Sequence, residues 1–101
     1  MRAAWLAVAA LVLSGCTAPV ALSDADRRVQ VVTTTGILAD LVRNVGGDRV
    51  LVDSIVPDDA DAHGYEPTLR DVRNVVYADV AFSNYLLLEA QNVIKALDAN
   101  L

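Results

Sequence analysis

The chain has little of several residue types that build sites or frameworks. It contains one cysteine and one histidine among 101 residues, and aromatic residues make up only 5%. One cysteine cannot form a disulfide within the chain, so no disulfide framework supports the fold. Thirteen acids outnumber eight basic residues, which gives a formal charge of −5. An acidic chain without a basic patch argues against a nucleic-acid partner. The length of the chain allows one small domain at most.

The motifs of several enzyme classes are also missing. No serine occupies a Gly-x-Ser-x-Gly turn, and the five glycines form neither a dinucleotide-binding Gly-x-Gly-x-x-Gly motif nor a Walker pattern. The adjacent acids Asp58 and Asp59 point in different directions in any regular backbone, which argues against a glycosidase pair. These absences predict that the chain is not an enzyme.

The first fifteen residues have the pattern of an export signal. Arg2 is followed by an unbroken apolar run over 3–13, and small residues precede Cys16. The run is well short of the roughly 20 residues that a membrane-spanning helix needs. Residues 13–16, Leu-Ser-Gly-Cys, resemble the bacterial lipobox, which implies cleavage before Cys16 and attachment of diacylglycerol to its sulfur. The alternative is an ordinary signal peptide with an incidental cysteine.

Composition divides the chain into three parts. Residues 1–15 are the predicted lipoprotein signal peptide, residues 16–28 a lipid-anchored tether, and residues 29–101 the folded region. Within the tether, the stretch 17–26 is small, polar and proline-bearing, which predicts a flexible linker. Removal of residues 1–15 takes away one positive charge, so the formal charge changes from −5 to −6.

From residue 29 the chain alternates between β-branched runs and helical periodicity. The predicted order is strand 29–34, helix 37–45, strand 50–56, helix 69–76, strand 79–83 and helix 86–97. Strands that alternate with helices indicate right-handed crossovers and a parallel sheet with flanking helices. The strands are nearly continuous in apolar residues, as expected when helices cover both faces. The sequence therefore predicts an α/β fold of βαβαβα order.

Local signals mark the ends of the predicted helices. Gly46 and Gly47 stop the first helix. Thr68 caps the second, with Asp71 in the capping-box position three residues later. Asn84 is the predicted cap of the third. The predicted buried stripe of the second helix is Leu69, Val72, Val75 and Val76.

The single histidine, His63, lies in the predicted loop 57–67 between the second strand and the second helix. Ligands of parallel α/β sheets bind on loops at the carboxyl ends of strands, so the topology places His63 at a functional edge. A neutral imidazole is a common metal ligand, but a zinc site needs about four ligands. Judged from the residues alone, a lone loop histidine is more often solvated or a helix-terminus partner, and the aspartates 58, 59 and 61 form a solvated acidic turn.

Residues 61–67, Asp-Ala-His-Gly-Tyr-Glu-Pro, closely resemble the Asp-Pro-His-x-Tyr-Glu-Pro segment of the metal-binding receptors (cluster A-I) of bacterial zinc and manganese ABC importers. Other segments are similar and in the same order: Val-Val-Thr-Thr-Thr at 31–35, Gly-Gly-Asp at 46–48 and Ala-Asp-Val-Ala-Phe-Ser-Asn at 78–84. The stretch 84–89 is also similar to an actinobacterial branch, the anchored-repeat ABC transporter receptors.

This resemblance implies that residues 29–101 are part of the N-terminal lobe of a bilobed receptor and that His63 is a ligand of Zn²⁺ or Mn²⁺. The metal is then cargo, which an extracytoplasmic protein, lipid-anchored to the cell membrane through Cys16, delivers to an ABC permease. Family members are longer, and their other ligands, usually two histidines and a carboxylate, lie downstream of residue 101. Ala62 replaces the usual proline, which removes a constraint on φ and is expected to loosen the loop.

Alternatives stay open for the whole chain and for one residue. The chain could instead be a truncated surface lipoprotein with an adhesive role or no autonomous function. A fragment of a metal-dependent hydrolase is a weaker alternative, because nothing in the chain could activate a water. Glu66 either orients His63 by accepting its second N–H or interacts with the dipole of the following helix.

Overall fold

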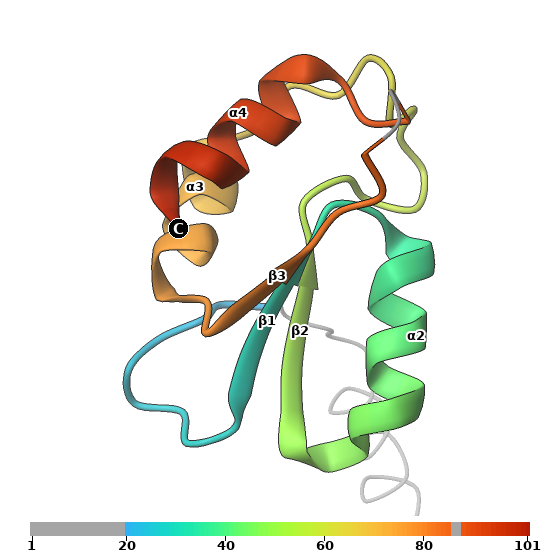
Figure 1. The fold of residues 1–101 in the computed structure, drawn as a ribbon. Coiled ribbons are helices and arrows are strands. Elements are labelled where there is room, and N and C mark those ends of the chain that lie inside the picture. Colours follow the sequence, from blue (N-terminus) through green and yellow to red (C-terminus); the bar gives the residue numbers. More distant parts are fainter. Residues whose placement is uncertain (1–19, 86–87) are drawn as a thin grey trace, which may run out of the picture.

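The fold alternates strands and helices. The computed structural model describes residues 20–85 and 88–101, so the predicted signal peptide and Cys16 lie outside the described residues. The elements are β1 (Val29–Thr33), α2 (Gly36–Gly46), the 3-10 turn η1 (Gly47–Arg49), β2 (Val50–Ser54), α3 (Leu69–Tyr77), β3 (Val80–Phe82) and α4 (Gln91–Asn100). The strands form a parallel sheet of order β2-β1-β3 (Figure 1). The prediction of an α/β fold with a parallel sheet is confirmed.

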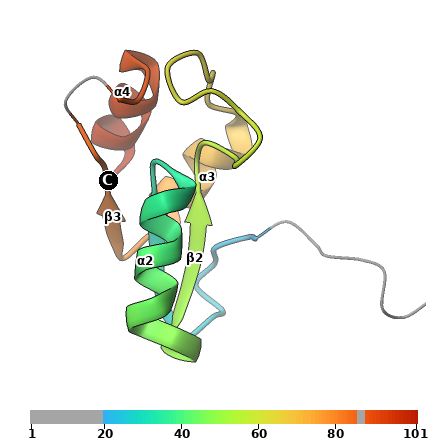
Figure 2. The ribbon, with the colours of Figure 1, turned by 90° about the vertical axis from the view of Figure 1, so that its right-hand side faces the viewer.

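Alternate strand residues point to opposite faces of the sheet and build two hydrophobic clusters. Val31 and Val52 pack with Ala39 of α2 on one face. Val32 belongs to a larger cluster on the other face, which α3 and α4 line (Figures 1 and 2). The buried members of the larger cluster are Leu22, Val32, Ile55, Val56, Val75, Val93 and Leu97. Within the described residues, no helix has the length and apolar character required to cross a membrane.

The two glycines at the end of α2, Gly46 and Gly47, have different roles. Gly47 has φ +56, a conformation that favours glycine, and its N–H donates to the Arg43 carbonyl. A methyl group on Gly46 would lie 2.5 Å from Val50 Cγ1, so only glycine lets the helix end come this close to β2. The predicted helix stop at Gly46 and Gly47 is confirmed.

The described part of the segment before β1, from Val20, is not the flexible linker that the composition of residues 17–26 predicted. From Val20 onward it packs on the fold, and Leu22 is fully buried in the larger cluster. The Leu22 N–H donates to Asn74 Oδ1 of α3 (3.3 Å), and Asn74 Nδ2 donates to the Val20 carbonyl (3.2 Å). The stretch around Leu22 has no helical or strand periodicity, so nothing in the sequence indicated that Leu22 is a core residue.

The buried face of α3 is mostly polar, and of the predicted stripe only Val75 is buried. Asp71 and Asn74 are buried together with Val75, whereas Leu69 and Val76 are 89% and 58% exposed. Both buried polar side chains form hydrogen bonds inside the fold. Satisfied polar groups can be buried without the cost of an unpaired one, so this network, together with Val75 in the larger cluster, sets the orientation of α3.

The last helix is shorter than predicted, because α4 begins at Gln91 and not at residue 86. Asn84 does not cap it. The Asn84 side chain instead donates to Thr35 Oγ1 (2.9 Å) and Glu89 Oε1 (3.1 Å). Tyr85 has φ +54, which takes the backbone out of the helical region. The predicted cap Asn84 and Glu89 of the predicted helix therefore form hydrogen bonds beside the ends of β1 and β3.

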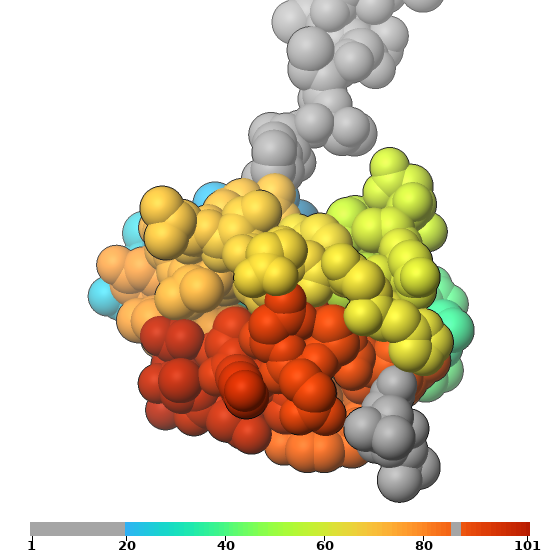
Figure 3. All heavy atoms as spheres, turned by 90° about the horizontal axis from the view of Figure 1, so that it is seen from above, coloured from blue at the N-terminus to red at the C-terminus, as the bar shows by residue number. Residues whose placement is uncertain are grey.

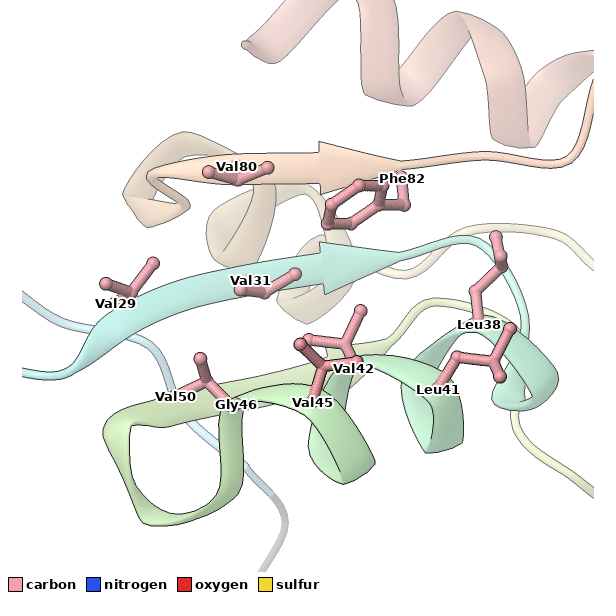
Figure 4. A pocket seen from close by; sticks show the side chains of 10 residues that line it. All are labelled: Val29, Val31, Leu38, Leu41, Val42, Val45, Gly46, Val50, Val80 and Phe82. Atoms are coloured by element: carbon pink, nitrogen blue, oxygen red, sulfur yellow. The ribbon is translucent and has the colours of Figure 1, made fainter.

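An apolar groove stays open beside α2. It has a volume of about 440 Å³ and lies between α2 and the strands (Figure 4). Its lining residues are Val29, Val31, Leu38, Leu41, Val42, Val45, Gly46, Val50, Val80 and Phe82. Leu41 and Val45 are 57% and 92% exposed, so the apolar stripe of α2 is only partly covered.

Candidate metal site

The carboxyl ends of the parallel strands bring three loops to one edge of the molecule (Figure 1). Figure 3, which looks onto this edge, shows the yellow loop 57–67 against the orange-red start of α4. A hydrogen bond of 2.8 Å from the Ala90 N–H to the Ala62 carbonyl joins the two segments. The predicted position of this loop at the carboxyl edge of the sheet is confirmed.

The side chain of His63 is exposed and paired with Asp61. The His63 N–H donates to Asp61 Oδ1 at 2.9 Å, and ring Nδ1 lies 3.3 Å from the same oxygen. These contacts hold the pKa of Asp61 below its ordinary value, with the backbone N–H of His63 as the largest cause and its ring as the second. Asp61 is therefore ionised near neutral pH and can orient the imidazole.

The pairing gives the two ring nitrogens different roles. If Nδ1–H donates to Asp61, the lone pair of Nε2 is free to bind a metal ion. This tautomer is assigned from the hydrogen bond. Metal-binding histidines usually donate their other N–H to a carboxylate or carbonyl group, which fixes the ring and raises its basicity. The geometry of His63 and Asp61 fits that arrangement.

Glu66 is not the partner of His63. Its Oε2 instead accepts a hydrogen bond from Asn92 Nδ2 of α4, so the orienting role considered for Glu66 is filled by Asp61. Together with the hydrogen bond between Ala90 and Ala62, this contact attaches the loop to the start of α4 on both sides of His63.

The loop ends in a capping box. Thr68 Oγ1 accepts from the Asp71 N–H at 3.2 Å, and Asp71 Oδ2 accepts from the Thr68 N–H at 2.8 Å, as predicted. Asp71 Oδ2 also accepts from the Tyr65 hydroxyl at 2.8 Å. Burial and the Asp71 carboxylate raise the pKa of Tyr65 to about 12, so the phenol remains a donor. These contacts fix the path of the chain from the loop into α3.

The other acids of the loop do not gather around His63. Asp58 and Asp59 are exposed. Asp58 lies against the first turn of α2, because a methyl group on Gly36 would be 1.8 Å from Asp58 Oδ1. A helix N-terminus favours a negative charge there. Among the described residues, no three or more histidines, cysteines or acids are grouped so as to hold a metal. This part of the chain therefore offers one imidazole nitrogen.

A polar cluster at the same edge was not predicted from the sequence. Glu89 is 3% exposed, and its Oε1 accepts from Thr34 Oγ1 and from both the N–H and Nδ2 of Asn84, the last two at 2.8 and 3.1 Å. Burial alone would raise the pKa of Glu89, but these hydrogen bonds outweigh it and the pKa is lowered. The feature of the sequence that could have indicated this cluster is a single acid, Glu89, directly after three leucines.

Comparison with known proteins gives concordant results. Residues 31–101 match the family described as ZnuA, zinc-uptake complex component A, periplasmic. The metal ABC transporter substrate-binding lipoprotein SloC of Streptococcus mutans is 40% identical over 84 residues, which are 83% of this chain and 28% of SloC. FimA of Streptococcus parasanguinis, described in the same words, is 45% identical over 67 residues (66% and 22%). The manganese ABC transporter substrate-binding lipoprotein PsaA of Streptococcus pneumoniae is 39% identical over 77 residues (76% and 25%).

The chain thus spans between 22% and 28% of the length of these three relatives. The family match begins in β1 and includes every later element of the described structure, together with the loop that carries His63. The family is one of transport components and not of enzymes. Because the match takes in well over half of the chain and the fold agrees with the one that the motifs implied, the chain belongs to the periplasmic zinc-uptake component family, ZnuA.

Proposed function

We propose that this chain is the N-terminal part of an extracytoplasmic receptor that captures Zn²⁺ or Mn²⁺ and delivers it to the permease of an ABC importer. The observation that carries the proposal is the exposed imidazole of His63, oriented by Asp61 on the loop after β2. The family match and the descriptions of its relatives as metal transporter lipoproteins support the same function.

The mechanism is coordination without turnover. Nε2 of His63 donates its lone pair to the metal, while Asp61 holds Nδ1. Imidazole nitrogen suits Zn²⁺ and Mn²⁺ when carboxylate oxygens complete the shell. One nitrogen is too few for a site of about four ligands. The remaining ligands therefore come from other parts of a protein of the length seen in the relatives.

The proposal includes an anchor at Cys16. Residues 13–16 match the lipobox, and the relatives are described as lipoproteins. Removal of residues 1–15 and attachment of lipid to Cys16 would hold the receptor at the outer surface of the cell membrane. An anchor there would keep the receptor beside the permease to which it delivers the metal.

The test is isothermal titration of the complete gene product with Zn²⁺ and with Mn²⁺. Loss of one ligand in His63→Ala should weaken binding roughly 100-fold, or about 3 kcal/mol, and leave the circular dichroism spectrum unchanged, because an exposed loop side chain contributes little to packing. Lys95→Ala, an exposed position on α4, is the control and should bind like the wild type. Undiminished affinity of His63→Ala for both metals would remove His63 from the site.

A further inference from the structure

Glu89 connects the ends of two strands. Its Oε1 accepts from Thr34, which directly follows β1, and from Asn84, which lies two residues after β3. Asn84 Nδ2 also donates to Thr35 Oγ1 at 2.9 Å. One buried carboxylate oxygen thus holds the carboxyl ends of neighbouring strands at the edge where the His63 loop lies.

The residue after Glu89 is bound to that loop. The Ala90 N–H donates to the carbonyl of Ala62, the residue before His63, at 2.8 Å. The position of Glu89 therefore fixes the Ala90 N–H, and this N–H holds the peptide group of Ala62. Residue 62 is alanine and not proline, which would restrict φ, so the loop backbone loses more conformational entropy when it becomes ordered. The hydrogen bond from Ala90 to Ala62 therefore contributes more to ordering this loop than it would with proline at position 62.

The carboxylate carries a cost that packing does not explain. Glu89 Oε2 is buried and has no hydrogen-bond partner among the described residues. An unpaired buried oxygen of an ionised group is unfavourable, and such exceptions to local rules are expected at functional sites. The hydrogen bonds at Oε1 offset this cost, and the residue after Glu89 makes the contact to the His63 loop.

We propose that Glu89 is a positioning residue for metal capture: through Ala90 it holds the Ala62 peptide, so that the direction of His63 Nε2 is set before the metal arrives. This inference rests on the proposed function. A ligand that is ordered in advance binds more tightly, because less conformational entropy is lost on binding.

Titration of the complete gene product with Zn²⁺ and with Mn²⁺ tests the inference. Glu89→Ala should bind about 10-fold more weakly or worse, as is usual when a group that orients a metal ligand is lost. Glu89→Gln keeps an oxygen that accepts from Thr34 and Asn84, so it should stay within about threefold of the wild type. In the His63→Ala background, Glu89→Ala should change the affinity no further, because its effect passes through His63.

Asn74→Ala is the matched control. Asn74 is a fully buried polar side chain whose bonds go to Asp53 and the segment before β1, so its loss should lower stability and spare metal affinity. Thr34→Val removes one donor to Glu89, so it should also weaken metal binding. If Glu89→Ala does not fold, Thr34→Val tests the inference in its place.

Three results would overturn the inference: wild-type affinity in Glu89→Ala, an equal loss of affinity in the His63→Ala background, or a loss in Glu89→Gln as large as in Glu89→Ala. If His63→Ala itself has no effect, the proposed function fails and not only the role of Glu89.

Discussion

Asp53 of β2 is a buried carboxylate, 5% exposed, that pairs with Arg70 Nη2 at 3.2 Å and Asn74 Nδ2 at 2.8 Å. Burial raises its pKa, and the hydrogen bond from Asn74 and the charge of Arg70 do not fully offset it. A raised pKa means that the folded state holds this proton more tightly than the unfolded state. The resulting stabilisation is present below the ordinary carboxyl pKa and is lost as pH rises through the raised value.

Asp53→Asn should therefore leave the free energy of unfolding at pH 7 unchanged or raise it, because it replaces a buried carboxylate with an uncharged amide of similar shape. The difference from the wild type should vanish below about pH 4, where a carboxyl group is protonated even in the unfolded state. Urea unfolding of both proteins at pH 7 and pH 3.5 measures this. A free energy of unfolding lowered by more than about 1 kcal/mol at pH 7 would show that the pair with Arg70 outweighs the cost of burial.

At the scale of elements, α3 joins the segment before β1 to the sheet through Asn74. This side chain bonds to Val20, Leu22 and Asp53 at once. The capping box at the N-terminal end of α3 fixes where the helix begins. Asn74 therefore connects three parts of the chain that are distant in sequence.

Asn74→Ala should lower the free energy of unfolding by about 2 to 4 kcal/mol, because it leaves buried partners unpaired. It should also free the segment before β1, so that trypsin cuts faster after Arg27 and Arg28. Asn44→Ala, an exposed asparagine of α2 that bonds only to the Asp40 carbonyl among the described residues, should change stability by less than about 0.5 kcal/mol. Equal tryptic rates in wild type and Asn74→Ala would show that the segment is held without Asn74, by the burial of Leu22 and the hydrogen bonds between Ser23 and Gln30.

The order of elements could be predicted from the sequence because it depends on local signals. β-Branched runs, the glycine pair at the end of α2 and the Thr68 cap each act within a few residues, and the structure contains all of them. The predicted start of the last helix was wrong because Asn84 and Glu89 bond to Thr34 and Thr35, about 50 residues earlier. A pairing over that distance leaves no trace in local periodicity.

At the scale of the whole molecule, the described part of the chain leaves two edges of the sheet and an apolar groove uncovered. Strands β2 and β3 are both edge strands of the sheet, and the apolar groove beside α2 leaves Val45 and Phe82 92% and 45% exposed. Open edges and exposed apolar surface both favour association, and small domains bury a smaller share of their surface than large ones.

Residues 20–101 expressed alone should therefore self-associate and unfold without a sharp transition. Val45→Gln together with Phe82→Gln should reduce the association by making the groove polar, whereas Asn44→Gln on the same helix should not. Sedimentation velocity at several concentrations measures the effect. A monomeric wild type with a two-state melt above about 60 °C, in the upper mesophile range, would contradict this.

The candidate site was predictable only in part. His63 could be located because a motif and the parallel topology both point to the loop after β2. Its partner could not, because Asp61 and Glu66 are both near in sequence and only the turn of the backbone decides between them. The role of Glu89 depends on contacts with two other strand ends and required the structure.

In the proposed receptor, Nε2 of His63 binds the metal directly. Anomalous diffraction from crystals of the complete gene product grown with Zn²⁺ tests it most directly. The expected result is a zinc peak about 2.0 to 2.1 Å from His63 Nε2, with Nδ1 still in contact with Asp61. A fully occupied zinc peak whose coordination shell does not include His63 would contradict the account.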